Sequence, residues 1–120
     1  MRIAILTALA LGALALPAAA ANYPVSGKWG LSTSSEKGPI DCTGKRIIAF
    51  NGNQRTDSNG GVPAYRNKSV TGGPTRFSVV DVFTNGQVSN ASVRYTLSLV
   101  DDDHVVMQGQ TGTLKLQRCE

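Results

Sequence analysis

The sequence lacks most of the motifs on which small enzymes rely. It has one histidine, His104, so a Ser-His-Asp triad would have to use it, and it has no G-x-S-x-G nucleophile elbow. Its two cysteines, Cys42 and Cys119, form no C-x-x-C pair, which argues against reactive thiols. Residues 38–46 depart from the P-loop spacing G-x-x-x-x-G-K-[ST]. We therefore expect no enzyme and no cofactor.

No hydrophobic run is long enough to cross a bilayer. The apolar stretch Ile3–Leu16 has about 14 residues, whereas a transmembrane helix needs roughly 20. Met1-Arg2 places a positive charge before it, Pro17 ends it, and four alanines follow, which is the pattern of a secretory signal peptide. We place cleavage after Ala21, with Ala20 as the alternative. The protein is thus expected to be periplasmic or secreted, with no membrane span in the mature chain.

The chain also lacks a clustered basic stretch. Removal of residues 1–21 leaves 99 residues, which suits a single domain over residues 22–120. Within it, 11 Lys and Arg face 8 Asp and Glu, but only Lys45 and Arg46 are adjacent. A nucleic-acid site would gather Lys and Arg in a stripe with aromatic residues between them. We therefore expect no nucleic-acid partner.

The two cysteines are expected to form a disulfide. An exported chain with an even cysteine count most often pairs them. The disulfide would join positions 77 apart (119 minus 42). By restricting the unfolded chain, it would raise the free energy of unfolding by about 4 kcal/mol at most. It would tie the last residues to an early segment.

The residues that are abundant are Thr, Ser, Val, Gly and Asn, which favour strands and turns. Ser92–Leu99 alternates strictly between polar and apolar residues, so Val93, Tyr95, Leu97 and Leu99 are expected to face a core. Further strands are expected in six segments: 27–33, 45–50, 65–70, 76–83, 104–108 and 113–118. In 76–83 the apolar phase slips between Val79 and Val80, which suggests a bulge or burial of both faces. Residues 51–63 are expected to form a long loop without a strand.

These strands predict an all-β fold, with an antiparallel meander from Arg76 to Arg118. Six to eight short strands in one small domain must protect their sheet edges, and closure into a small barrel or half-barrel does so. A two-sheet β-sandwich is the alternative. The expected Cys42–Cys119 bridge favours closure, because it brings the last strand near an early one.

The segment Gly27-Lys28-Trp29 resembles the G-x-W signature of calycins, the lipocalin-like barrels. The size of the chain and a nearby cysteine are also similar to the periplasmic metalloprotease inhibitors of calycin type, and the overall pattern resembles small exported alphaproteobacterial proteins. The resemblance implies that Trp29 covers one end of a barrel and that Arg118, in the last strand, packs over it. For an inhibitor, it implies an N-terminal segment, here including Tyr23 and Pro24, that inserts into a protease cleft.

Two groups of acidic residues are candidates for chemistry. Asp101-Asp102-Asp103-His104 is expected to be a solvated turn, with metal binding or hydrolysis as alternatives, although three consecutive aspartates cannot all point one way. We therefore assign no metal ligand. Asp81 lies among valines and is expected to face outward; if it faced inward it would need a partner, for which Arg94 is the candidate.

Together these features predict an exported, non-enzymatic binding or inhibitor module of the bacterial envelope. Its partner is expected to be a protein or a small apolar ligand, and a small lipophilic-ligand carrier is the alternative. A hydrolase or metal-binding protein that uses the Asp101–His104 turn is the second alternative. The candidate binding residues are those of the N-terminal segment and the long polar loop: Tyr23, Pro24, Arg55, Asp57 and Tyr65.

Overall fold

A computed structural model describes residues 22–120, and the predicted signal peptide, 1–21, lies outside the described residues. Within 22–120 the chain forms strands and no helix. The strands are β1 (Gly27–Leu31), β2 (Ile47–Asn51), β3 (Gln54–Asp57), β4 (Tyr65–Gly72), β5 (Arg76–Phe83), β6 (Ala91–Asp101), β7 (His104–Gly109) and β8 (Gly112–Arg118). The described part of the chain therefore has no helix long and apolar enough to span a membrane.

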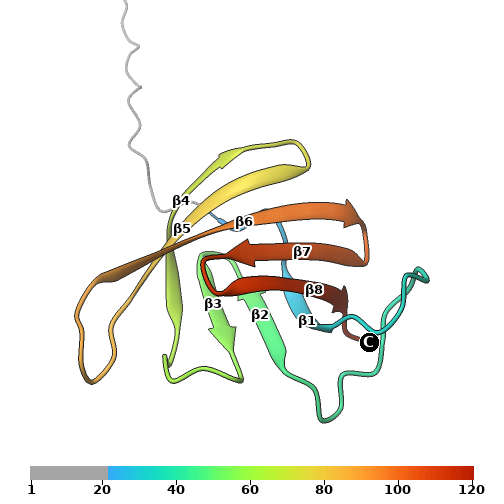
Figure 1. Ribbon diagram of the computed structural model, residues 1–120, viewed down its shortest axis with the longest axis horizontal. Helices are drawn as coiled ribbons and strands as arrows, with labels where there is room; N and C mark the ends of the chain where they lie inside the picture. Colours follow the sequence, from blue (N-terminus) through green and yellow to red (C-terminus); the bar gives the residue numbers. More distant parts are fainter. Residues whose placement is uncertain (1–21) are drawn as a thin grey trace, which may run out of the picture.

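The eight strands form a closed antiparallel barrel in chain order. Closure comes from β1, which pairs with β2 on one side and with β8 on the other, where Trp29 lies opposite Arg118. In Figure 1, β6–β8 run across the view while β2–β4 run from top to bottom. The predicted all-β fold and the meander from β5 to β8 are confirmed, and the two-sheet sandwich is excluded.

The segment predicted as a strandless loop contains β3, so that prediction was wrong. β3 pairs along its whole length with β2, from Asn51 opposite Gln54 to Ile48 opposite Asp57. Gly52, with φ of 65°, makes the tight turn between them. The sequence of β3 is Gln-Arg-Thr-Asp, and its inward residues are charged. The alternation of apolar and polar residues that reveals a strand was therefore missing.

The bulge suggested for 76–83, as one of two explanations for its apolar phase, is absent, and a register shift occurs on the neighbouring strand instead. β5 is regular, and the register shift falls in β4, between Asn67 and Ser69. The apolar phase of β5 slips because Asp81 is inward and fully buried, whereas its neighbour Val80 is only half-buried. Asp81 thus faces the interior, contrary to our prediction.

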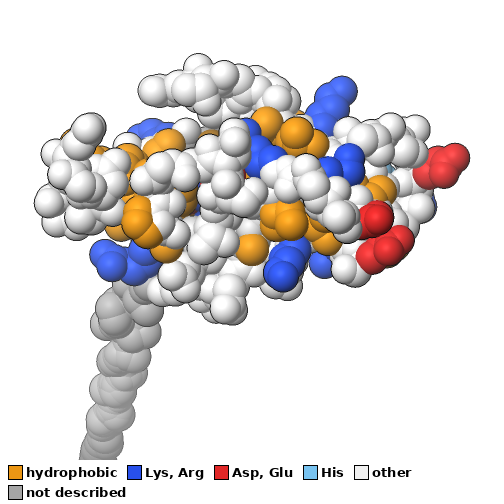
Figure 2. Space-filling model, turned by 90° about the horizontal axis from the view of Figure 1, so that it is seen from below, with side chains coloured by type: hydrophobic (Ala, Val, Ile, Leu, Met, Phe, Trp, Pro, Cys, Tyr) orange, Lys and Arg blue, Asp and Glu red, His pale blue; other side chains and the backbone are white. Residues whose placement is uncertain are grey.

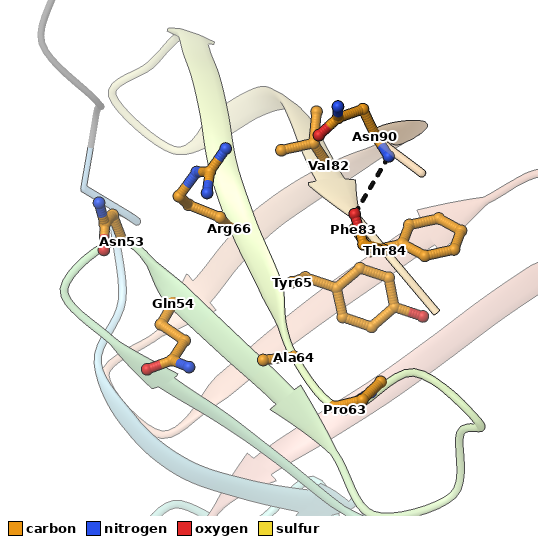
Figure 3. Close-up of a pocket in the computed structure, with 10 residues that line it drawn as sticks. All are labelled: Asn53, Gln54, Pro63, Ala64, Tyr65, Arg66, Val82, Phe83, Thr84 and Asn90. Atoms are coloured by element: carbon orange, nitrogen blue, oxygen red, sulfur yellow. Dashed lines mark hydrogen bonds between the residues drawn. The ribbon is translucent and has the colours of Figure 1, made fainter. Parts of the chain in front are cut away.

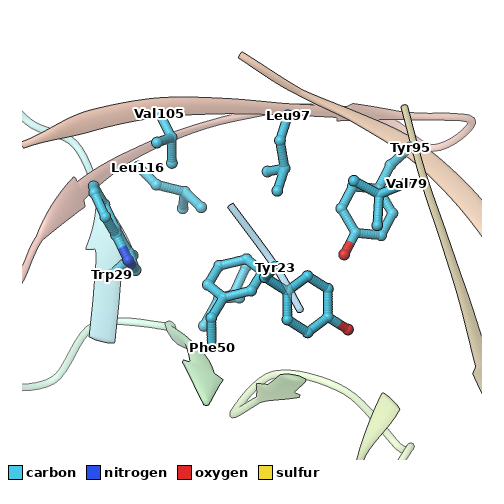
Figure 4. Close-up of a cluster of buried hydrophobic side chains, with 9 residues drawn as sticks. Tyr23, Trp29, Phe50, Val79, Tyr95, Leu97, Val105 and Leu116 are labelled. Carbon is cyan, nitrogen blue, oxygen red and sulfur yellow. The ribbon is translucent and has the colours of Figure 1, made fainter. Parts of the chain in front are cut away.

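One hydrophobic cluster fills the barrel. Its buried members are Tyr23, Trp29, Ile48, Phe50, Val79, Tyr95, Leu97, Val105 and Leu116. Figure 4 shows Trp29 at one end of this cluster and Tyr95 at the other, with Tyr23 between them. Tyr23 precedes β1 and is held there by its backbone N–H, which donates to Gly52 O at 3.0 Å. Its ring packs edge-on against Phe50, with centroids 4.9 Å apart.

The predicted disulfide between Cys42 and Cys119 is confirmed. It joins the connection between β1 and β2 to the residue that follows β8. Ile40 adds a parallel bridge to Cys119, and its N–H donates to Arg118 O at 2.8 Å. The disulfide lies so close to β1 that a Cβ at Gly30 would be 2.7 Å from the Cys42 sulfur.

We expect Gly30→Ala to lower the free energy of unfolding by about 1–3 kcal/mol, because the added methyl overlaps a sulfur atom that the disulfide holds in place. Gly61→Ala is the matched control, since a Cβ there meets nothing within 4 Å. Urea unfolding of both variants checks the expectation. Equal urea midpoints for the two variants would contradict the expectation, because they would show that the disulfide moves to accommodate the methyl group.

Charged side chains are spread over the barrel surface. Figure 2 shows lysines and arginines at separate points of one face, with acidic side chains gathered toward one end. This distribution agrees with the scatter of basic residues along the sequence.

Candidate functional site

The two ends of the barrel differ in the side chains that cover them. At the closed end, the Arg118 guanidinium carbon lies 4.5 Å from the centre of the Trp29 ring. Arg118 Nη2 donates to Asp102 O at 2.8 Å, and Trp29 Nε1 donates to Ser26 O at 3.1 Å. Trp29 and Arg118 therefore lie as the calycin resemblance implies, and they close this end.

The other end, which we call the mouth, is where β3 ends and the β7–β8 turn lies. It holds a cavity of about 310 Å³, the mouth pocket. Apolar side chains of β6, β7 and β8 form one wall: Val93, Met107 and Leu114. Charged and aromatic side chains form the opposite wall and the floor: Arg46, Arg55, Asp57, Tyr65 and Tyr95. The pocket therefore offers an apolar surface and a polar surface that face each other.

The floor of the mouth pocket rests on a buried ion pair. Arg55 is 3% exposed and Asp81 0% exposed. Arg55 Nε donates to Asp81 Oδ2 at 2.9 Å, and Tyr95 Oη donates to the same oxygen at 2.7 Å. Asn67 Nδ2 donates to Asp81 Oδ1 at 3.1 Å. The carboxylate thus receives three hydrogen bonds, which compensate the cost of burying its charge.

Two tyrosines hold the guanidinium of Arg55. Its central carbon lies 3.8 Å from the ring centre of Tyr65 and 4.9 Å from that of Tyr95. Cation–π contacts of this kind strengthen when they are shielded from water. Tyr65 is fixed in turn by Phe83, with ring centroids 5.3 Å apart. The orientation of the guanidinium is therefore fixed by contacts within the protein.

Burial and charge keep this cluster in one protonation state. Burial works against the charged guanidinium, yet the neighbouring Tyr95 and Asp81 raise the pKa of Arg55 overall. Burial also raises the pKa of Tyr95, in spite of the nearby Arg55 cation. Arg55 therefore stays charged and Tyr95 stays protonated, which is the state that its hydrogen bond to Asp81 requires.

A second ion pair stands at the rim of the mouth. Arg46 donates to Asp57 through Nε at 3.0 Å and through Nη2 at 2.6 Å, a two-pronged contact. Partial burial opposes the charge of Asp57, but these bonds hold the pKa of its carboxyl below the ordinary value. The side chain of Asp57 is 7% exposed, so its charge is largely covered by Arg46.

Three of the candidate binding residues meet at the mouth: Arg55, Asp57 and Tyr65. The other two do not line the mouth pocket. Tyr23 is buried in the core, where burial, together with the nearby Asp81, raises the pKa of its phenol, and Pro24 follows it, half-buried. The N-terminal segment, which in an inhibitor would insert into a protease cleft, is thus docked on its own barrel at Tyr23.

Sequence reasoning missed four members of the site: Arg46, Asn67, Asp81 in its inward position, and Tyr95 as a polar residue. The signal for Asp81 was present, because an isolated acid among valines needs a partner when buried. The suggested partner, Arg94, was wrong: it lies opposite Val80 and is exposed. Arg55, in the segment taken for a loop, is the actual partner.

A second cavity, the outer pocket, lies on the outside of the barrel over β3, β4 and β5. It measures about 360 Å³, and its walls include Gln54, Arg66 and Val82. β3 and β4 pair at only two positions, Gln54 with Arg66 and Arg55 with Tyr65. Figure 3 shows Tyr65 and Phe83 side by side at this seam. Tyr65 lines both cavities and so forms part of the wall between them.

The Asp101–His104 turn lies at the closed end, away from the mouth. His104 Nδ1 is 2.9 Å from Asp101 Oδ1, and Nε2 is 3.2 Å from Ser34 O. The hydrogen bond to Asp101 raises the pKa of His104 above its ordinary value. Both ring nitrogens thus engage the protein, and they tie the turn to the loop after β1. Among residues 22–120, no three acidic, cysteine or histidine side chains gather as a possible metal site.

The mouth therefore combines a preorganised cation, aromatic rings and an apolar wall, an arrangement suited to binding. Arg55, the tyrosines and Asp81 are already hydrogen-bonded or stacked with one another. Comparison of the chain with protein-family models, with curated proteins and with solved structures finds no match in any of the three.

Proposed function

We propose that this protein is an exported, non-enzymatic binding module that takes a small ligand into the mouth pocket. The observation that carries the proposal is the pocket itself. Its volume of about 310 Å³ lies at the lower end of the range for small-molecule sites, and its apolar wall faces a few fixed polar groups, as is usual in such sites. The predicted signal peptide and the disulfide support a periplasmic or secreted location.

The packing of the barrel limits how deep a ligand can lie. Trp29, Phe50 and Leu97 are at most 2% exposed and occupy the interior below the mouth. A ligand therefore sits in the mouth, partly open to solvent. This distinguishes the proposal from a carrier that encloses a large lipid within the barrel.

The N-terminal segment gives less support to an inhibitor that inserts its own tail into a protease. Tyr23 is 7% exposed and its backbone is bonded to Gly52, so release would expose a core aromatic ring. Such an exposure costs about 1.5–3 kcal/mol for a large side chain. The mouth, by contrast, is open without any rearrangement.

The proposal predicts that a neutral fluorescent probe, phenylnaphthylamine, binds the protein in the mouth. Val93→Trp should weaken its binding at least about tenfold, because the larger ring fills the apolar wall of a pocket of this size. Val100→Trp is the matched control: it makes the same change at a side chain that is 63% exposed near the closed end. Probe fluorescence, titrated with each variant, gives the affinities.

Two results would contradict the proposal. One is no binding of the probe to the wild-type protein. The other is equal loss of binding in Val93→Trp and Val100→Trp, which would place the probe outside the mouth. Circular dichroism of both variants ensures that the comparison is made between folded proteins.

A further inference from the structure

The guanidinium of Arg55 is only partly used by the protein. Its Nε donates to Asp81, whereas Nη1 and Nη2 have no hydrogen-bond partner among residues 22–120. In the same part of the chain, the enclosed polar side-chain atoms without a partner are Tyr23 Oη and Asn67 Oδ1. The two Nη groups are thus not sealed in the core. Arg55 lines the mouth pocket, and 4% of its side chain is exposed.

The nearby carboxylates do not compete for these two groups. Asp81 receives its hydrogen bonds from Arg55 Nε, Tyr95 and Asn67. Asp57 is held by the two-pronged contact with Arg46. The charges of the two ion pairs, Arg55 with Asp81 and Arg46 with Asp57, cancel, so what the site offers a ligand is the unused hydrogen-bond donors of the Arg55 guanidinium.

We propose that the ligand of the mouth pocket is a small amphipathic carboxylate whose two oxygens accept hydrogen bonds from Arg55 Nη1 and Nη2. This rests on the proposed function and adds the chemical class of the ligand. The two Nη groups lie in one plane and form a fork that matches a carboxylate. Stacking on Tyr65 fixes that plane in advance, so little conformational entropy is lost on binding.

The rest of the ligand is defined by the opposite wall. Val93, Met107 and Leu114 offer an apolar surface, so the carboxylate carries a compact aliphatic or aromatic body. The Arg46–Asp57 pair at the rim is already neutral, so it offers no second cation to a ligand. The site therefore selects monoanions over dianions.

Calorimetry with a matched pair of probes tests this class. Naphthoate and the neutral amide of the same acid share a ring system and differ at the carboxyl group. The wild-type protein should bind naphthoate about 10-fold to 100-fold more tightly than the amide, the usual gain from charge-assisted hydrogen bonds. Heteronuclear NMR should show that naphthoate changes the chemical shifts of Val93, Met107 and Leu114.

A double variant, Arg55→Gln with Asp81→Asn, removes the cation without leaving a buried unpaired carboxylate. It should bind the two probes with equal affinity. Arg76→Gln makes the same loss of arginine at an exposed position at the far end of β5, and it should keep the preference. If the double variant does not fold, the comparison of the two probes on the wild-type protein still decides.

The outcomes separate this inference from the proposed function. Equal affinity of naphthoate and amide for the wild-type protein, with shifts at the mouth, would overturn the carboxylate and leave the binding module intact. A preference for naphthoate that Arg76→Gln abolishes would also overturn it, because the effect would be one of net charge. No shift at the mouth with either naphthalene probe or with phenylnaphthylamine would overturn both.

Discussion

Replacement of Asp81 by alanine is expected to lower the free energy of unfolding by about 3–5 kcal/mol, the usual result of breaking a buried ion pair. The variant would leave the Arg55 guanidinium buried without its anion, and would remove the acceptor of Tyr95 Oη and of one Asn67 Nδ2 bond. The total free energy of unfolding of a small domain is roughly 5–15 kcal/mol. The loss is therefore a large share of the stability of this barrel.

Urea unfolding, followed by the fluorescence of Trp29, measures the effect. Asp102→Ala is the control, since Asp102 is an exposed acid that makes no side-chain hydrogen bond among the described residues. The double variant Asp81→Asn with Arg55→Met should recover much of the loss, because it removes both charges and keeps an amide for the hydrogen bonds. If Asp81→Ala unfolds at the same urea concentration as Asp102→Ala, the ion pair contributes nothing.

Removal of the disulfide has the second largest expected effect. Cys42→Ser with Cys119→Ser frees a loop of 77 residues in the unfolded chain, which lowers stability by about 4 kcal/mol at most. The fold itself should persist, because Cys119 N–H still donates to Lys28 O at 2.9 Å and Glu120 N–H to Ile40 O at 2.9 Å. These bonds hold the last residues in place without the bridge.

Thermal unfolding of three samples distinguishes these effects. The serine variant and the chemically reduced wild-type protein should unfold at the same lowered temperature, well below that of the oxidised protein. A normal circular dichroism spectrum of the variant below that temperature would show that the barrel still forms. An unchanged midpoint after reduction would mean that the bridge adds no stability.

Strands whose inward residues are apolar could be predicted from the sequence. β6 is the clearest, because Val93, Tyr95 and Leu97 alternate with polar residues and a half-buried strand demands that period. β3 could not be predicted in this way. Its inward residues, Arg55 and Asp57, are tolerated inside because they form ion pairs with Asp81 and Arg46 in the folded barrel.

The site was predictable only in part. Arg55, Asp57 and Tyr65 were candidates because they lie in a long polar segment, and they do meet at the mouth. Asp81 and Tyr95 come from β5 and β6, which are distant in the sequence, and closure of the barrel brings them to Arg55. No local sequence pattern identifies two charged residues that pair only when the barrel brings their strands together, as Arg55 and Asp81 do.

The sequence by itself determined most of the strand content and the Cys42–Cys119 pairing, since both depend on residue type and order along the chain. The place of Trp29 under Arg118 was implied by the resemblance to calycins, and the contact is present. The tertiary structure decided which way Asp81 faces and which arginine pairs with it. It also decided that Tyr23 is part of the core. The physical reason is that the cost of burying a charge or a phenol depends on the groups that surround it, and strand pairing across the closed barrel supplies those groups.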